Sequence, residues 1–206
     1  MLNENQVIQL RDSLNNEGYC QVNNIFHPQL IDYFKLSSGL LQLEDLYSDK
    51  EENNLVKSTN KRDKAQYAPF IGETLLLYLT SIYSKISGKN LTPTYSFYRN
   101  YFQGNSLNRH TDRPSCQYSA TIQIDSSKDE SWPIWIQSKN RQDIECNSKI
   151  GDAVFYKGEE VEHWREELQY EYSSHLFLHW VDKDDPTYKE FWLDGRKNLL
   201  QNPWKK

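Results

Sequence analysis

Two short segments far apart in the chain carry side chains that can bind a metal ion together. The first, Asn108–Pro114, contains His110 and Asp112, and the second, Glu162–Arg165, contains His163. A histidine and a carboxylate two positions apart on extended backbone project to the same side. Two imidazoles and one carboxylate on one face of an octahedron leave the opposite face open, which suits an Fe(II) ion that works on oxygen.

The residues around these segments predict the β-strands that must bring them together. After Gly88 the pattern becomes alternating and rich in aromatic and β-branched residues, which indicates strands. We expect strands at 94–102, 118–125, 132–137, 153–156 and 174–181, and a further one around Ile144. Gly104 and Gly151 mark turns. Strands joined by turns, with helices mainly at the ends, predict a mainly β fold with flanking helices and a double-stranded β-helix (jelly roll) core.

The flanking segments have helical spacing. We expect helices over residues 3–17, from Pro28 onward, and over 70–87, with a short strand near residue 20. The second helix should face Leu30, Ile31, Phe34 and Leu36 inward, and the third should lay a row of apolar residues on a sheet. Asp185 and Pro186 predict the start of a last helix. The chain is interpreted as one domain, 1–206, with a helical N-terminal region at 1–89, a jelly-roll core at 90–182 and a C-terminal helix at 183–206.

Composition narrows the functional class. The chain has 206 residues and a net charge of -5, which argues against a protein that binds nucleic acid by neutralising phosphates. No apolar run approaches the length of a membrane span, so we expect no membrane contact and a cytoplasmic protein. The three cysteines, Cys20, Cys116 and Cys146, have no metal-binding spacing and are interpreted as reduced thiols. The oligomeric state stays open.

Residues 44–66 are polar, charged and weakly periodic. Their charges are most simply a solvated surface. Loops of this length also serve as lids over active sites, in which case Tyr47, Lys64 or Tyr67 would touch a substrate.

Several motifs together resemble the 2-oxoglutarate/Fe(II)-dependent oxygenase superfamily, on its prolyl-hydroxylase-like side. They are Tyr-x-x-Gly from Tyr101 to Gly104, His110-Thr111-Asp112, the Gly151-Asp152 turn, and His163 followed by a terminal strand that ends at Asp182. The resemblance covers roughly residues 90–182.

The resemblance implies that His110, Asp112 and His163 bind Fe(II), with 2-oxoglutarate and O2 as co-substrates. The activity it implies is hydroxylation of an unactivated C–H bond, coupled to decarboxylation of 2-oxoglutarate to succinate. A carboxylate at Asp112 argues for hydroxylation over halogenation, because it occupies the position that a halide would need. Specificity lies in loops without a readable motif, so the substrate can be an amino acid, a peptidyl residue such as proline, or a small metabolite.

One feature departs from the family. Its members usually hold the distal carboxylate of 2-oxoglutarate with an Arg or Lys on the terminal strand, where this chain has Ser173 and then His175. An arginine is suited to this task because its guanidinium can engage a carboxylate with two hydrogen bonds. Arg165 shares the facing of His163 and is favoured over Arg99, and His175 is a third candidate.

Tyr101 and Gln123 are predicted to donate further hydrogen bonds to the co-substrate. Other interpretations stay open at this point. Arg165 can instead pair with Glu162 or Glu166 on the surface, and Arg113 can fix its own loop. His179 can be a buried neutral histidine, as can His175. The alternative function is a non-catalytic, cupin-like metal-binding jelly-roll module.

Overall fold

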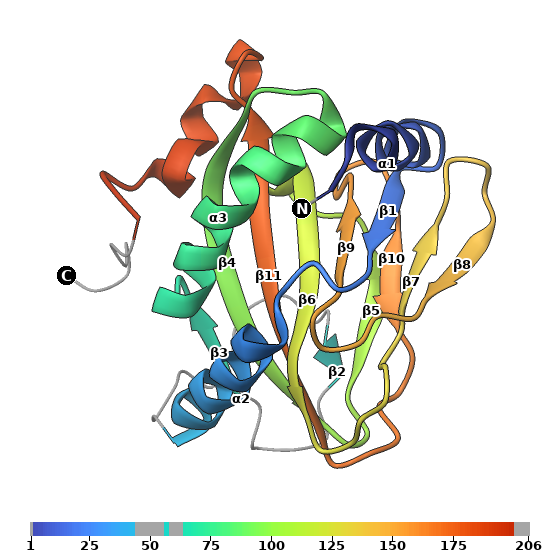
Figure 1. Ribbon diagram of the computed structural model, residues 1–206, viewed down its shortest axis with the longest axis vertical. Helices are drawn as coiled ribbons and strands as arrows, with labels where there is room; N and C mark the ends of the chain where they lie inside the picture. The colour runs from blue at the N-terminus through green and yellow to red at the C-terminus, as the bar shows by residue number, and fades with distance from the viewer. Residues whose placement is uncertain (1, 44–55, 58–63, 200–206) are drawn as a thin grey trace.

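Two antiparallel sheets dominate the protein (Figure 1). The computed structural model describes residues 2–43, 56–57 and 64–199. The larger sheet has the order β1–β9–β6–β11–β4–β3, formed by Tyr19–Val22, Ala153–Tyr156, Tyr118–Ser126, Tyr172–Asp182, Leu91–Phe102 and Lys64–Tyr67. The smaller sheet has the order β2–β5–β10–β7–β8, formed by Val56–Lys57, Ser106–His110, His163–Arg165, Ile134–Gln137 and Asp143–Cys146. The prediction of a mainly β fold with a jelly-roll core is confirmed.

Three α-helices flank the sheets: α1 at Glu4–Asn16, α2 at Pro28–Leu43 and α3 at Phe70–Ser87. The side chain of Asn3 accepts from the backbone of Gln6, and the side chain of Gln6 accepts in return, so a capping box starts α1. The helix α3 lies across the larger sheet in Figure 1. It ends at Gly88, whose φ of 69° suits a residue without a Cβ.

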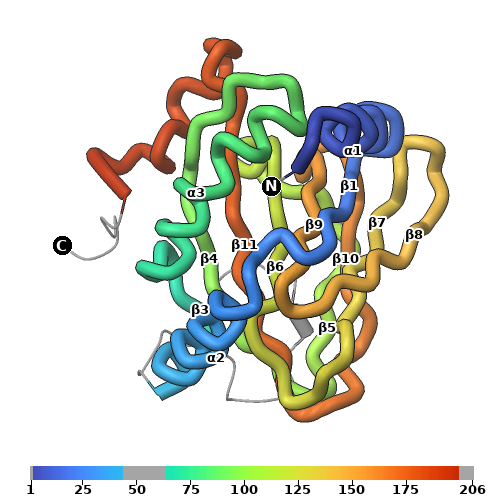
Figure 2. Tube along the Cα trace, viewed as in Figure 1, coloured from blue at the N-terminus to red at the C-terminus, as the bar shows by residue number. Residues whose placement is uncertain are grey.

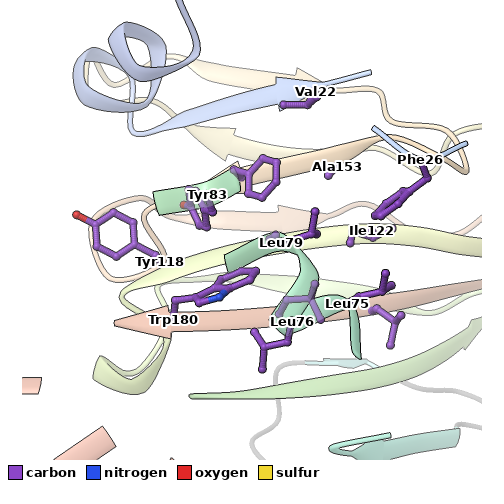
Figure 3. Close-up of a cluster of buried hydrophobic side chains, with 14 of the residues drawn as sticks. Val22, Phe26, Leu75, Leu76, Leu79, Tyr83, Tyr118, Ile122, Ala153 and Trp180 are labelled. Atoms are coloured by element: carbon purple, nitrogen blue, oxygen red, sulfur yellow. The ribbon is translucent and has the colours of Figure 1, made fainter. Parts of the chain in front are cut away.

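The main hydrophobic core lies between α3 and the larger sheet (Figure 3). Leu76, Leu79 and Tyr83 from α3 pack there with Ile122 of β6 and Trp180 of β11, and all five are fully buried. Such burial is the main favourable term in folding. The core therefore holds β6 and β11 rigidly, and these two strands also border the interior between the sheets.

The predicted facing of α2 is wrong in part. Phe34 is buried as expected, but Leu30 is 38% and Leu36 is 71% exposed. Tertiary packing uses a narrower stripe of this helix than its apolar residues suggest.

A second, smaller core fills the space between the two sheets. It contains Ile134 and Ile136 of β7, Val154 and Tyr156 of β9, and Val161 before β10. Figure 2 shows β5 and β10, which come from distant parts of the chain, beside each other at this interior. The inner face of the smaller sheet is therefore where widely separated residues meet.

A last helix does begin at Pro186, as predicted, but it is not a regular α-helix. Asp185 does cap the segment by accepting from Thr187 N at 3.0 Å, but Pro186–Gly195 forms 3₁₀ turns (η2). The turns break near Leu193 and Asp194, whose φ values are 52° and 54°. The hydroxyl of Tyr67 donates to Asp194 Oδ2 at 2.6 Å, so a tertiary contact fixes the bend. Residues 200–206 lie outside the described portion of the chain.

The charged segment 44–66 is described only in places, and Tyr47 lies outside the described residues. Lys64 begins β3, and its ammonium donates to the carbonyl oxygen of Gln42. Lys64 and Tyr67 thus have structural contacts. Among the described residues, no helix combines the length and the apolar character needed to cross a membrane.

Candidate metal centre

His110, Asp112 and His163 converge on one point inside the fold. Asp112 Oδ1 lies 3.7 Å from His110 Nε2 and 3.5 Å from His163 Nε2. The three ligand atoms lie within 4.8 Å of one another. Metal–ligand bonds of about 2.1 Å at right angles place neighbouring donor atoms about 3 Å apart, so only a small contraction is needed to hold an ion.

The two imidazoles are held in the tautomer that binds metals. Nδ1 of His110 lies 2.7 Å from Asn108 O, and Nδ1 of His163 lies 3.1 Å from Val161 O. A carbonyl oxygen only accepts, so each ring carries its proton on Nδ1 and presents the Nε2 lone pair to the centre. The donor set of two imidazoles and one carboxylate fits Fe(II).

The charges at the centre also favour the ligating forms. Burial, followed by the neighbouring His163, lowers the pKa of His110, which keeps its imidazole neutral. Burial alone would raise the pKa of Asp112, but His163, His179 and His110 outweigh it and hold that pKa well below its ordinary value. The carboxylate is therefore ionised at neutral pH.

Asp112 follows β5 in a loop that the backbone of Gly158 supports. Asp112 N donates to Gly158 O at 2.8 Å. The second carboxylate oxygen, Oδ2, accepts from Ser119 Oγ at 3.0 Å. Sequence reasoning did not identify Gly158 or Ser119. Ser119 lies in the predicted strand 118–125, but a serine in a strand carries no signal of its own.

Arg165 lies in the interior and not on the surface. Its side chain is 1% exposed. It donates to the carbonyl oxygen of Trp132, to Thr121 Oγ1 at 3.2 Å and to His175 Nδ1 at 3.3 Å. Among the described residues it forms no salt bridge, and its buried Nε has no hydrogen-bond partner. Burial lowers its pKa to about 10, so the guanidinium remains charged at neutral pH.

The other two anchor candidates differ from Arg165 in charge or position. Burial and the nearby Arg165 lower the pKa of His175 well below its ordinary value, so its imidazole is neutral. Its Nε2 lies 2.8 Å from Ser173 Oγ. Arg99 lies opposite His175 in the register of β4 and β11. Its guanidinium lies over the ring of Tyr101, 5.5 Å from the centroid.

Tyr101 and Gln123 are both buried. The ring of Tyr101 meets Trp132 edge-on at 4.8 Å. Gln123 Nε2 donates to Glu130 O at 3.2 Å, and the buried Oε1 has no partner among the described residues. In this orientation Oε1 is a free acceptor among the described residues, and Nε2 keeps a second hydrogen that Glu130 O does not use.

Tyr156 links the two halves of the site and was not predicted from the sequence. Its ring lies 4.7 Å from that of His163. Both Asp112 and Arg165 are close enough to influence the pKa of its hydroxyl, which burial raises well above its ordinary value. The His-Asp-His group and the Arg165 guanidinium therefore border one interior region.

Two other arginines, Arg109 and Arg113, already have partners within the protein. Arg109 forms salt bridges with Asp143 at 2.9 Å and with Glu162 at 2.8 Å. Glu162 is therefore the partner of Arg109 and not of Arg165. Arg113 lies 3.7 Å from Asp194 and over the ring of Tyr95, 4.7 Å from its centroid. Arg113 thus fixes its loop, one of the interpretations that the sequence left open.

No protein-family model matches the chain, and no curated protein matches it. Solved structures do. A prolyl-4-hydroxylase from Pseudomonas putida is 14% identical, with a TM-score of 0.66, over 84% of this chain and 97% of that one. A prolyl hydroxylase from Trichoplax adhaerens, in complex with a peptide fragment of the hypoxia inducible factor oxygen degradation domain, is 16% identical, with a TM-score of 0.65, over 90% and 93%.

A third similar structure shows that this fold also serves a different reaction. The non-heme α-ketoglutarate-dependent epimerase SnoN from nogalamycin biosynthesis is 10% identical, with a TM-score of 0.70, over 87% of this chain and 84% of that one. The chain therefore has the fold of the prolyl-hydroxylase-like 2-oxoglutarate/Fe(II) oxygenases.

Proposed function

We propose that this chain is an Fe(II)- and 2-oxoglutarate-dependent dioxygenase that hydroxylates an unactivated C–H bond of an amino-acid, peptidyl or small-metabolite substrate. The shared fold and the His-Asp-His group support this class. The observation that carries the proposal is Arg165. An unpaired charge in a protein interior is costly, and a guanidinium without a carboxylate partner among the described residues, two residues beyond His163, suits an anionic co-substrate.

Each element of the site has a role in this reaction. His110, Asp112 and His163 would hold the iron, and Arg165 would bind the distal carboxylate of 2-oxoglutarate. When bound, Fe(II) supplies the oxygen chemistry that couples decarboxylation of 2-oxoglutarate to succinate and CO2 with hydroxylation of the substrate. One oxygen atom of O2 enters succinate and the other enters the product. The buried aromatic rings of Tyr101 and Trp132 would exclude water near Arg165.

The reaction class can be tested before the substrate is known. Fe(II) and 2-oxoglutarate added without oxygen should produce a weak visible absorption band. Oxygen should then yield succinate, and amino acids or peptides that include the substrate should accelerate its release. His163→Ala should abolish both signals. His27→Ala is the matched control, because His27 is exposed at the start of α2.

A different outcome would favour a non-catalytic module. If the protein binds Fe(II) but 2-oxoglutarate changes neither its absorption spectrum nor its melting temperature, the oxygenase proposal is wrong. The chain would then be a metal-binding jelly roll without turnover.

A further inference from the structure

The two carboxylate oxygens of Asp112 face different surroundings. Oδ1 faces the Nε2 atoms of His110 and His163, at 3.7 and 3.5 Å. Oδ2 faces away from them and accepts from Ser119 Oγ at 3.0 Å. We propose that Ser119, oriented by His179, is a positioning residue that restricts Asp112 to binding the metal through one oxygen. This inference rests on the proposed function.

The hydrogen bonds around Ser119 have one consistent direction. Its Oγ lies 2.9 Å from His179 Nδ1, 3.0 Å from Asp112 Oδ2 and 3.1 Å from Cys116 O. The carboxylate and the carbonyl only accept, and the hydroxyl has one proton. The ionised carboxylate is the stronger acceptor, so Ser119 donates to Asp112. His179 then carries its proton on Nδ1 and donates to Ser119.

The fold holds the three hydrogen-bonded groups of His179, Ser119 and Asp112 in place. Ser119 on β6 and His179 on β11 are direct partners in the larger sheet. Both side chains are buried, and the ring of His179 lies 4.6 Å from that of Tyr95. Asp112, Cys116 and His179 also lie close enough together to hold an ion. The hydroxyl of Ser119 already joins Asp112 to His179 there, so hydrogen bonds occupy that side of the carboxylate.

Gly158 restrains the same oxygen from another direction. A Cβ at this position would lie 2.3 Å from Asp112 Oδ2 and 2.4 Å from Cys116 O. The backbone therefore packs directly against Oδ2, and the peptide of Gly158 also accepts from Asp112 N. To bring Oδ2 towards the metal, the carboxylate would have to leave both Ser119 and this packed position.

The restraint on Asp112 matters because an octahedral metal ion has few coordination positions. Three protein atoms would leave three positions, and the proposed reaction would need all of them for the 2-oxo acid and O2. A carboxylate that binds through both oxygens would take one of them. Loss of the Ser119 hydroxyl should therefore weaken 2-oxoglutarate binding more than metal binding, because the second oxygen compensates at the metal.

The test uses Co(II), a spectroscopic probe, with the full chain under anaerobic conditions. In Ser119→Ala, the dissociation constant of Co(II) should change less than about threefold, while that of 2-oxoglutarate rises at least about tenfold, the scale of losses for residues that support metal ligands. The visible spectrum of bound Co(II) should shift towards higher coordination. Ser119→Thr should restore 2-oxoglutarate binding. His179→Phe keeps a ring beside Tyr95 and should show a smaller loss of the same kind.

Ser87→Ala is the matched control, because Ser87 is a buried serine at the end of α3 whose hydrogen bonds to described residues stay within its own turn. Wild-type affinities for both ligands in Ser119→Ala and His179→Phe would overturn the role of Ser119 and leave the proposed function standing. So would a loss of Co(II) affinity equal to the loss of 2-oxoglutarate affinity. If the wild-type chain binds no Co(II), both proposals are wrong.

Discussion

His110 and His163 lie directly opposite each other in the antiparallel pair of β5 and β10. Their ring centroids are 4.3 Å apart. Because directly opposite residues of an antiparallel pair lie close together, this pairing brings the two imidazoles side by side. The centre therefore depends on sheet register, and Asp112 completes it from the loop that immediately follows β5.

Replacing Arg165 by methionine tests whether this arginine binds the co-substrate or stabilises the fold. Loss of the charge-assisted contacts to 2-oxoglutarate, worth about 3 kcal/mol, should raise the KM for this co-substrate about 100-fold. The melting temperature of the ligand-free protein should stay equal or rise, because Arg165→Met removes a buried charge that has no carboxylate partner among the described residues. Succinate release and thermal melting measure the two effects.

Arg99→Met is the control for this experiment, since Arg99 is the other arginine near His175. In wild type, 2-oxoglutarate should raise the melting temperature by binding only the folded state. An anchor at Arg99 is indicated if that rise disappears in Arg99→Met and persists in Arg165→Met.

His179 should make the metal-free protein less stable in mild acid. Burial lowers its pKa from 6.5 to about 4. Between these pH values the unfolded chain binds a proton that the folded protein does not bind. The neutral His179 therefore costs no stability above about pH 6.5, and the free energy of unfolding falls as the pH drops towards 4. The loss is about 3 kcal/mol, at about 1.4 kcal/mol per unit. The lowered pKa of Asp112 acts below this window, since its ordinary value is 3.8.

Urea unfolding of the metal-free protein at pH 7, 5.5 and 4 measures this dependence. His179→Phe removes the titrating group, so its free energy of unfolding should fall less steeply with acid than that of wild type. Parallel curves for the two proteins would show that His179 does not control this window.

Breaking the buried pair of Glu73 and Arg196 should destabilise the protein strongly. Arg196 Nη1 lies 3.0 Å from Glu73 Oε2, and its Nη2 donates to Thr94 O at 2.7 Å. Glu73→Gln leaves the guanidinium without its counter-charge and should cost about 3–5 kcal/mol. Glu73→Gln combined with Arg196→Met should cost less than the sum of the single changes. Urea unfolding of the four proteins provides the cycle, and additive losses would contradict the coupling.

Much of the fold could be predicted because local patterns and the final structure agree. The strand Ala153–Tyr156 was predicted with the same bounds, and residues 118–125 lie within β6. The start of the last helix at Asp185 and Pro186 was predicted, but its 3₁₀ geometry and its break were not. Its cap at Asp185 is a local signal, but the bend at Asp194 depends on Tyr67, a partner more than a hundred residues away. Tertiary contacts override propensity in such places.

The residues of the candidate site also divide into those that the sequence could predict and those that it could not. His110, Asp112, His163 and Arg165 stand out because histidine, aspartate and arginine have chemistry that a spacing argument can use. Tyr156 and Gly158 carry no comparable signal, since an aromatic residue in a strand and a glycine in a turn are ordinary. Their positions become meaningful only when the distances to His163 and Asp112 are known.

Gly158→Ala should damage the centre although none of the three converging residues is replaced. The new methyl group would lie 2.3 Å from Asp112 Oδ2 and 2.4 Å from the backbone oxygen of Cys116, so the carboxylate or its loop must move. We expect at least about a tenfold loss of Fe(II) affinity, as is typical when the support of a ligand is lost. Gly39→Ala is the matched control, because Gly39 is exposed within α2 and a Cβ there meets nothing within 4 Å. That change should stabilise the protein by about 0.5–1 kcal/mol through helix propensity. Unchanged Fe(II) affinity in a folded Gly158→Ala protein would mean that the loop absorbs the methyl group and that Asp112 does not depend on this packing.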